Sequence, residues 1–117
     1  SKLRSKFVGN AKEYFVVPLE EFQNKIEKTQ SALLDLLEKN NDLSPETKAI
    51  EKRVIYYEYL QSYNNYQKFY SYHKKTNAKL PDDYYDPIIN MDLNDDEMFR
   101  YCRAYRNLVV ENFRHSS

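Results

Sequence analysis

A short acidic stretch in the second half of the chain, MDLNDDE, has residue types that bind calcium. Asp92, Asn94 and Asp96 match the first, third and fifth ligand positions of an EF-hand loop. That loop requires glycine at its sixth position and a bidentate glutamate at its twelfth, where this chain has Glu97 and Arg103. The pattern instead predicts a helix start, in which Asn94 and Glu97 form a capping box. We therefore predict no metal ligands here.

The other acidic side chains and the histidines form no recognisable catalytic or metal-binding pattern. Asp82, Asp83 and Asp86 could bind a hard cation or act as an acid and base pair, but the sequence places no nucleophile or histidine beside them. His73 and His115 are too distant in sequence to be a local ligand pair. A solvated turn is the simpler interpretation of the aspartates, and no catalytic residue is predicted.

The single cysteine and the single glycine exclude further chemistries. Cys102 permits no internal disulfide, no CxxC redox pair and no cysteine-rich metal site, and its place on an apolar stripe predicts a core residue. Gly9 alone cannot form a glycine-rich phosphate loop. Arg100, Arg103 and Arg106 follow at three-residue steps and could clamp an anion, although pairing with neighbouring acidic side chains is the commoner use. No cofactor-binding residue is predicted.

Length and charge place the chain among small globular domains. With 117 residues it can build one core, and 18 basic residues against 18 acidic residues leave a formal net charge of zero. This balance argues against a nucleic-acid partner and against a polybasic membrane patch, because both normally need a basic surplus. No apolar run approaches the roughly 18 residues of a membrane-spanning helix. The opening residues, SKLRSK, contain no methionine and no signal-peptide core, which suggests a piece of a longer protein.

Hydrophobic spacing predicts an all-α domain. One glycine and four prolines give little of the turn chemistry that sheets need, and apolar residues recur at three- and four-residue steps. Pro18 and Pro45 suit the first turn of a helix, and Ser44 can cap the second one. The predicted helices of this single domain, 1–117, are 18–39, 45–75, 82–90 and 95–114.

The two long helices are expected to form an antiparallel hairpin, because only a few residues join them. A short helix and a final helix should then pack against that hairpin. Ahead of the hairpin, residues 1–17 are expected to be a short helix or an extended lead-in that Phe15 and Val17 tie down.

The second predicted helix contains a dense row of tyrosines in VIYYEYLQSYNNYQKFYSYHK, residues 54–74. Four of them share one helical face and could supply much of the core: Tyr59, Tyr63, Tyr66 and Tyr70. A row of phenols could also contact another protein, or stack bases or sugars. The few lysines nearby provide little of the basic groove that base stacking needs. The rings left to one side are the predicted interaction residues: Tyr56, Phe69 and Tyr72.

Four segments follow one another in a characteristic order in the second half of the chain. They are YQKFYSYHKK at 66–75, LPDDYYD at 80–86, MDLNDDE at 91–97 and YCRAYRNL at 101–108. This order resembles the helical region that precedes the thioredoxin-like domain in bacterial envelope thiol-disulfide oxidoreductases of the ResA/TlpA type. The activity of that family belongs to a CxxC on the thioredoxin-like domain, which this sequence lacks, so no catalytic residue is carried over.

The resemblance implies a non-catalytic helical accessory domain that positions a thioredoxin-like redox domain or recruits its substrate, in the bacterial cell envelope or periplasm. The expected partner is that domain in the same chain, or a protein substrate, and the reading frame should then continue into a WCxxC-like segment. An alternative is a free-standing helical module that binds a protein or a small ligand through its tyrosine-rich face. Neither hypothesis makes this chain itself an enzyme.

Overall fold

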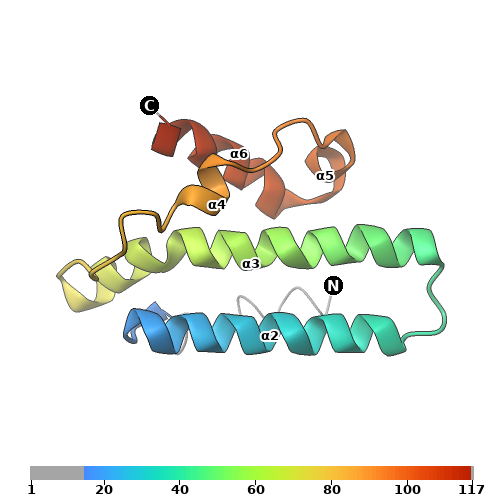
Figure 1. The fold of residues 1–117 in the computed structure, drawn as a ribbon, viewed down its shortest axis with the longest axis horizontal. Helices are drawn as coiled ribbons and strands as arrows, with labels where there is room; N and C mark the ends of the chain where they lie inside the picture. The colour runs from blue at the N-terminus through green and yellow to red at the C-terminus, as the bar shows by residue number, and fades with distance from the viewer. Residues whose placement is uncertain (1–14, 117) are drawn as a thin grey trace.

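The computed structural model describes residues 15–116, and every regular element within them is helical (Figure 1). The helices are α2 (Leu19–Lys39), α3 (Pro45–Lys74), α4 (Asp86–Ile89), α5 (Asp96–Tyr101) and α6 (Arg103–Ser116). The all-α fold predicted from the sequence is confirmed for this part of the chain.

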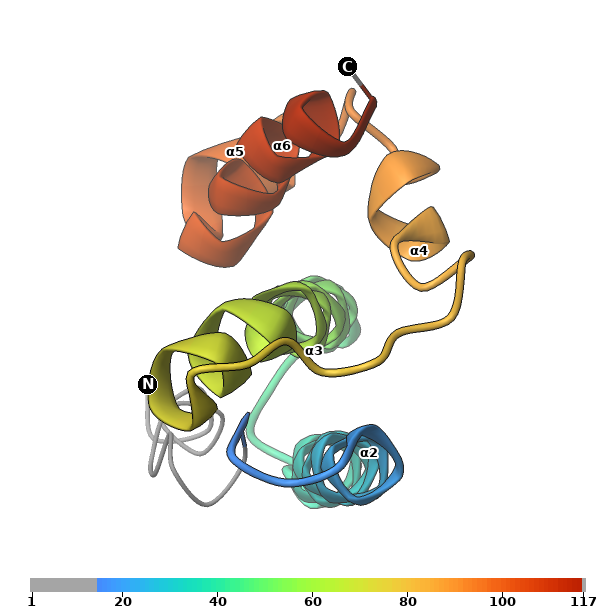
Figure 2. The same cartoon turned by 90° about the vertical axis from the view of Figure 1, so that its left-hand side faces the viewer.

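The helices form three layers, with α3 in the middle. α2 and α3 run antiparallel as a hairpin, and α4, α5 and α6 lie on the opposite side of α3 (Figures 1 and 2). The final helix, α6, contacts α3, α4 and α5. The predicted hairpin, followed by a short helix and a final packing helix, is therefore present.

Local sequence signals set the starts of the two long helices. α2 begins directly after Pro18, and Glu20 and Glu21 lie in its first turn, where the helix dipole favours negative charge. At the start of α3, Ser44 Oγ accepts a hydrogen bond of 3.1 Å from the backbone N–H of Thr47, as predicted. Both signals are local, which is why the sequence predicts these two boundaries well.

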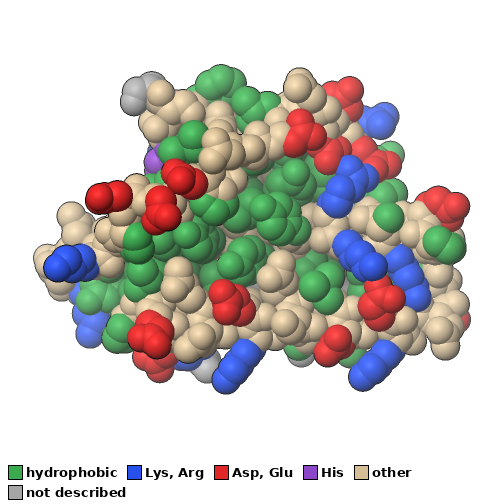
Figure 3. All heavy atoms as spheres, in the orientation of Figure 1, with side chains coloured by type: hydrophobic (Ala, Val, Ile, Leu, Met, Phe, Trp, Pro, Cys, Tyr) green, Lys and Arg blue, Asp and Glu red, His purple; other side chains and the backbone are tan. Residues whose placement is uncertain are grey.

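The central helix α3 is buried on two sides because it lies between two layers. Toward α2, Ile55 packs against Leu33 and Leu37. Farther along the same side, the rings of Tyr66 and Phe22 stack with centroids 4.4 Å apart. The opposite side of α3 shares a larger cluster with the last three helices: Val54, Tyr57, Leu60, Ile88, Met98, Cys102, Ala104, Tyr105 and Leu108. Figure 3 shows hydrophobic side chains along the boundary between α3 and the last three helices.

The segment before the hairpin is only partly described. Of the predicted lead-in 1–17, residues 1–14 lie outside the described part of the chain. Phe15 is buried, and its ring lies 5.4 Å from that of Phe22 and 4.7 Å from that of Phe69. Val17 packs against the same cluster. The two residues expected to hold the lead-in therefore do contact the core.

The predicted short helix, 82–90, is shorter than expected. Residues 82–85 form turns closed by backbone hydrogen bonds between residues three positions apart. α4 covers only Asp86–Ile89. Pro87 explains the difference, because it has no N–H to donate to the carbonyl of Asp83 and so cannot continue a helix from the preceding turn.

The predicted last helix, 95–114, is interrupted at Cys102 and is two helices. Cys102 has an extended backbone, with φ −122° and ψ 106°. The chain changes direction there, and Met98 before the break and Leu108 after it both lie fully buried in the same cluster. The prediction of one continuous helix was wrong because an apolar stripe does not reveal where a helix changes direction.

The arginine that follows the break satisfies the carbonyl groups that the break leaves without helical partners. Arg106 Nη1 donates to the carbonyl of Phe99 at 2.8 Å and to that of Arg100 at 3.3 Å. In a continuous helix, backbone N–H groups four residues later would have bonded these carbonyls. The guanidinium thus acts as a side-chain cap for α5.

The start of α5 also differs from the predicted capping box of Asn94 and Glu97. Asp95 caps the helix, and its Oδ1 accepts a 3.1 Å hydrogen bond from Met98 N. Arg53, from α3, donates to Asp95 Oδ2 at 2.7 Å and also pairs with Glu97. Glu97 therefore serves an ion pair between two layers rather than a local cap.

Removing one buried leucine should show how strongly the layer of α4, α5 and α6 is held against α3. We expect Leu108→Ala to lower the free energy of unfolding by about 2–5 kcal/mol, because it leaves a cavity in the larger cluster. Urea unfolding followed by circular dichroism at 222 nm measures the change. Leu36→Ala, on an exposed position of α2, is the matched control and should change stability by less than about 0.5 kcal/mol. Equal losses for both variants would contradict the described packing.

Candidate protein-interaction surface

Much of the tyrosine-rich face of α3 is used by the core. Among residues 15–116, four tyrosines are buried: Tyr57 and Tyr66 on α3, and Tyr84 and Tyr105 elsewhere. Three of their hydroxyls donate to backbone carbonyls of other segments, namely Tyr66 to Val17, Tyr84 to Tyr63 and Tyr105 to Asp92. The ring of Tyr63 in turn stacks on that of Tyr84, with centroids 4.1 Å apart. Tyr59, Tyr63 and Tyr70 are partly buried against core clusters, so little of the face that they share with Tyr66 is left for a ligand-binding crevice.

The structure does not bring the three predicted interaction residues into one surface. Tyr56 and Tyr72 are exposed, at 43% and 69%, but sixteen residues separate them, or roughly 24 Å along α3. Phe69 is partly buried and stacks on Phe15. Phe69 and Tyr72 line one shallow hollow at the C-terminal end of α3. Their role in an interaction stays a prediction.

A larger group of exposed apolar side chains lies on the outward side of α5 and α6. Phe99, Val110 and Phe113 are 52%, 55% and 63% exposed. Arg106 links them, since it contacts the carbonyl of Phe99 and stands four and seven residues before Val110 and Phe113 on the same helix face. We call this surface the outer face and define it by Phe99, Arg103, Arg106, Val110 and Phe113. Figure 3 shows hydrophobic side chains exposed over α6.

The apolar spacing of Cys102, Tyr105, Val109 and Phe113 predicts a buried stripe that includes Phe113, and for that reason the sequence prediction missed the outer face. Beyond the break at Cys102, the buried positions of α6 are Ala104, Tyr105, Leu108 and Asn112. Asn112 is buried because its Nδ2 donates to the carbonyls of Ile88 and Ile89, each at 2.8 Å, and so ties α4 to α6. An apolar pattern cannot identify a buried asparagine, so it predicts burial of Phe113 and misses the burial of Asn112.

The outer face is cationic as well as apolar. Arg103 and Arg106 belong to it, and Arg100 lies beside it, with its guanidinium 5.6 Å from the ring centre of Tyr101. The only acidic residue of α6 is Glu111, which lies against the groove between α3 and α6 and 3.5 Å from Arg114. Within residues 15–116, Arg100, Arg103 and Arg106 do not pair with neighbouring acidic side chains as predicted, and Glu97 pairs with Arg53 instead.

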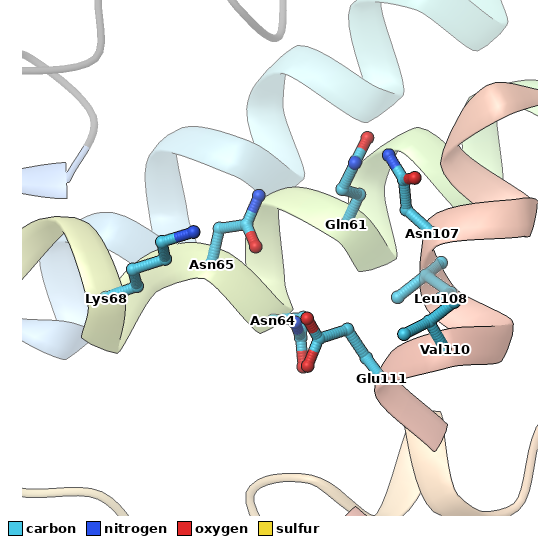
Figure 4. Close-up of a pocket in the computed structure, with 8 residues that line it drawn as sticks. All are labelled: Gln61, Asn64, Asn65, Lys68, Asn107, Leu108, Val110 and Glu111. Atoms are coloured by element: carbon cyan, nitrogen blue, oxygen red, sulfur yellow. The ribbon is translucent and has the colours of Figure 1, made fainter. Parts of the chain in front are cut away.

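A polar groove of about 260 Å³ runs between α3 and α6 (Figure 4). Its lining consists of Gln61, Asn64, Asn65 and Lys68 from α3, and Asn107, Leu108, Val110 and Glu111 from α6. The side chains of Gln61 and Asn107 point toward one another across it, and Lys68 lies farther along α3 (Figure 4). Val110 belongs both to this groove and to the outer face, so the two surfaces are continuous.

The other candidate sites take structural roles. Asp92 Oδ1 accepts a hydrogen bond from Asn94 N at 2.9 Å, and Cys102 is buried. His115 stacks on Tyr85, with ring centres 4.0 Å apart. Within residues 15–116, no three His, Cys, Asp or Glu side chains are grouped closely enough to hold a metal ion.

Comparisons with known proteins do not assign this chain to a family. The chain matches no protein-family model, no curated protein and no solved structure. No helix of the described part is long and apolar enough to cross a membrane. The function must therefore be inferred from the surfaces themselves.

The buried phenols make the fold sensitive to alkaline pH. Burial raises the pKa of Tyr57, Tyr63 and Tyr66 to about 12, and it also raises that of Tyr84. An unfolded tyrosine has a pKa near 10, so above that pH the unfolded chain loses protons that the native chain retains. This contribution to the free energy of unfolding is fully present below about pH 10 and is lost as pH rises toward about 12.

We expect helix content, measured by circular dichroism at 222 nm, to be stable to about pH 9.5 and to fall between about pH 10 and 12. Tyr63→Phe should move this midpoint to higher pH, because the Tyr63 hydroxyl makes no hydrogen bond within residues 15–116 and only its ionisation is removed. Tyr56→Phe, on an exposed ring, is the matched control. An unchanged midpoint in Tyr63→Phe would contradict this account.

Proposed function

We propose that this chain is a non-catalytic helical accessory domain that binds another protein domain through the outer face of α5 and α6. The observation that supports this proposal is the exposed row of Phe99, Val110 and Phe113 interleaved with Arg103 and Arg106. Aromatic residues and arginine are enriched at the energetic centres of protein interfaces. Exposed apolar groups on one helix side, rather than scattered singly, mark such sites.

The charge of the outer face selects the kind of partner. Its arginines favour a protein surface that carries Asp and Glu around an apolar recess, because charge complementarity speeds association and disfavours wrong partners. A second copy of this chain would place Arg103 and Arg106 against like charges if the two outer faces met. The formal net charge of zero gives no general attraction to nucleic acid. The partner is therefore a different protein domain with an acidic surface.

The resemblance that the four segments between residues 66 and 108 carry suggests which domain this is. We propose a thioredoxin-like domain of the same protein, or a protein substrate of that domain, in the bacterial cell envelope or periplasm. The accessory domain would then hold the redox domain or its substrate in place, with no cofactor of its own. A reading frame that continues into a WCxxC-like segment would support this partner.

The partner can be identified by crosslinking from the outer face. Phe113→p-benzoylphenylalanine should capture one acidic protein domain on irradiation, whereas the same replacement at Leu36, exposed on α2, should not. With the captured domain purified, we expect Val110→Asp combined with Phe113→Asp to weaken binding at least about tenfold, because the new carboxylates cannot be buried unpaired and repel an acidic surface. Isothermal titration calorimetry measures the affinity.

Leu36→Asp is the matched control for that double variant, since it adds a carboxylate to an exposed leucine on a helix in the opposite layer. It should leave the affinity unchanged. Binding by the wild-type chain should also weaken as salt rises, because exposed charges are screened. A double variant that binds as tightly as the wild type would overturn the proposed docking surface.

The absence of catalysis is tested separately. The purified chain should neither reduce insulin disulfides nor oxidise a reduced peptide, because its only thiol, that of Cys102, is buried and has no second cysteine. Turnover is followed by insulin turbidity. Activity that survives Cys102→Ser would show that the chain is an enzyme of another kind.

A further inference from the structure

The groove between α3 and α6 contains carboxamide groups that the fold does not use. Gln61 and Asn65 project from α3 and Asn107 from α6, and none of them has a hydrogen bond to another residue in the described part of the chain. Some carboxamides outside the groove have structural partners, as Asn112 shows by bonding two carbonyls of α4. The groove amides are therefore available to a ligand.

A fourth amide in the groove is nearly inaccessible to solvent. Asn64 is 8% exposed, and its Oδ1 lies 2.8 Å from His115 Nε2. Its Nδ2 has no hydrogen-bond partner among residues 15–116. Buried donors in native structures are almost always paired, so an unpaired one that lines a groove calls for an acceptor there. The ring stack of His115 on Tyr85 helps to hold Asn64 in this position.

We infer that this groove binds an extended peptide segment of about three residues. Gln61 and Lys68 are seven residues apart, which places them roughly 10 Å apart along α3. Three residues of extended chain span about the same length, at roughly 3.3 Å each. Each such residue offers one N–H and one C=O, and a carboxamide can both donate to and accept from them. The walls of the groove thus match the hydrogen-bonding pattern of a peptide backbone.

The size and lining of the groove favour this ligand class over others. Sites for small molecules are usually about 300–1,000 Å³ and mostly apolar or aromatic, whereas this groove is about 260 Å³ and lined largely by amides. None of its lining residues is aromatic, so it lacks a ring for a sugar to stack on. Lys68 at one end can pair with a carboxylate on the segment.

The source of the segment rests on the proposed function. Val110 lines the groove and is exposed on the outer face, so a domain docked on that face could insert an extended loop directly beside α6. The outer face would then supply apolar and ionic contacts, and the amides of the groove would hydrogen-bond the backbone of the inserted loop. The partner is accordingly an acidic domain with an extended segment next to its contact surface.

A tripeptide tests the groove without the partner. We propose titrating N-acetyl-Ala-Ala-Ala, with its C-terminal carboxylate unblocked, into the ¹⁵N-labelled chain and following the side-chain amide signals by NMR. Saturable shifts are expected at Gln61, Asn64, Asn65 and Asn107. Asn107→Ala should raise the Kd about three- to tenfold, because it removes one or two hydrogen bonds. Asn24→Ala, on an exposed position of α2, is the matched control and should leave the Kd unchanged.

Three results would overturn the inference. They are the absence of saturable shifts, an equal Kd for Asn107→Ala and the wild type, and stronger shifts with maltotriose than with the tripeptide. Because the tripeptide is not the partner, its failure leaves the binding test of the outer face intact, and Phe113→Asp alone tests that face because Phe113 does not line the groove. Conversely, a failed outer-face test leaves the tripeptide result standing, so the two proposals fall separately.

Discussion

Three buried tyrosine hydroxyls in this domain donate to backbone carbonyls of other segments, and the arrangement of the connecting segments depends on these bonds. A buried hydroxyl without a partner would cost about 1–3 kcal/mol. Tyr66 meets the requirement by holding the segment before α2, Tyr84 by holding the chain after α3 against α3 itself, and Tyr105 by holding the loop before α5. Phenylalanine would fill the same volumes but would leave these segments without their bonds. This explains why the chain uses tyrosine so heavily in its core.

A second consequence follows from the central position of α3. Because α3 is covered on both sides, most of its tyrosine rings pack against neighbouring helices. The surface available to partners therefore lies on the layer of α4, α5 and α6. α6 is buried on one side only, so its opposite side presents Val110, Phe113 and arginines to solvent. The pair of bonds from Arg53 to Asp95 and Glu97 holds the start of α5 against α3 and so helps to position this layer. The core and the outer face are thus two results of one packing arrangement.

The sequence predicts the hairpin better than it predicts the last layer, and the reason is the range of the interactions. Ser44 caps α3 through a residue three positions away, so its role can be read locally. The predicted capping box of Asn94 and Glu97 does not form at the start of α5, because Glu97 pairs with Arg53, forty-four residues earlier. The burial of Asn112 depends on carbonyls of Ile88 and Ile89 that no sequence pattern points to. Long-range polar bonds are therefore what sequence periodicity fails to show.

The same distinction between local and long-range interactions applies to the candidate surfaces. The sequence by itself determined the helical class, the long antiparallel pair, the buried cysteine and the absence of a CxxC, because these depend on composition and on local periodicity. Only the tertiary structure decided that the helix breaks at Cys102, that Phe113 faces solvent and that Asn64 and Asn107 line one groove. A side chain's neighbours across two helices are set by how those helices cross, and the spacing of residues along one helix carries no information about that crossing.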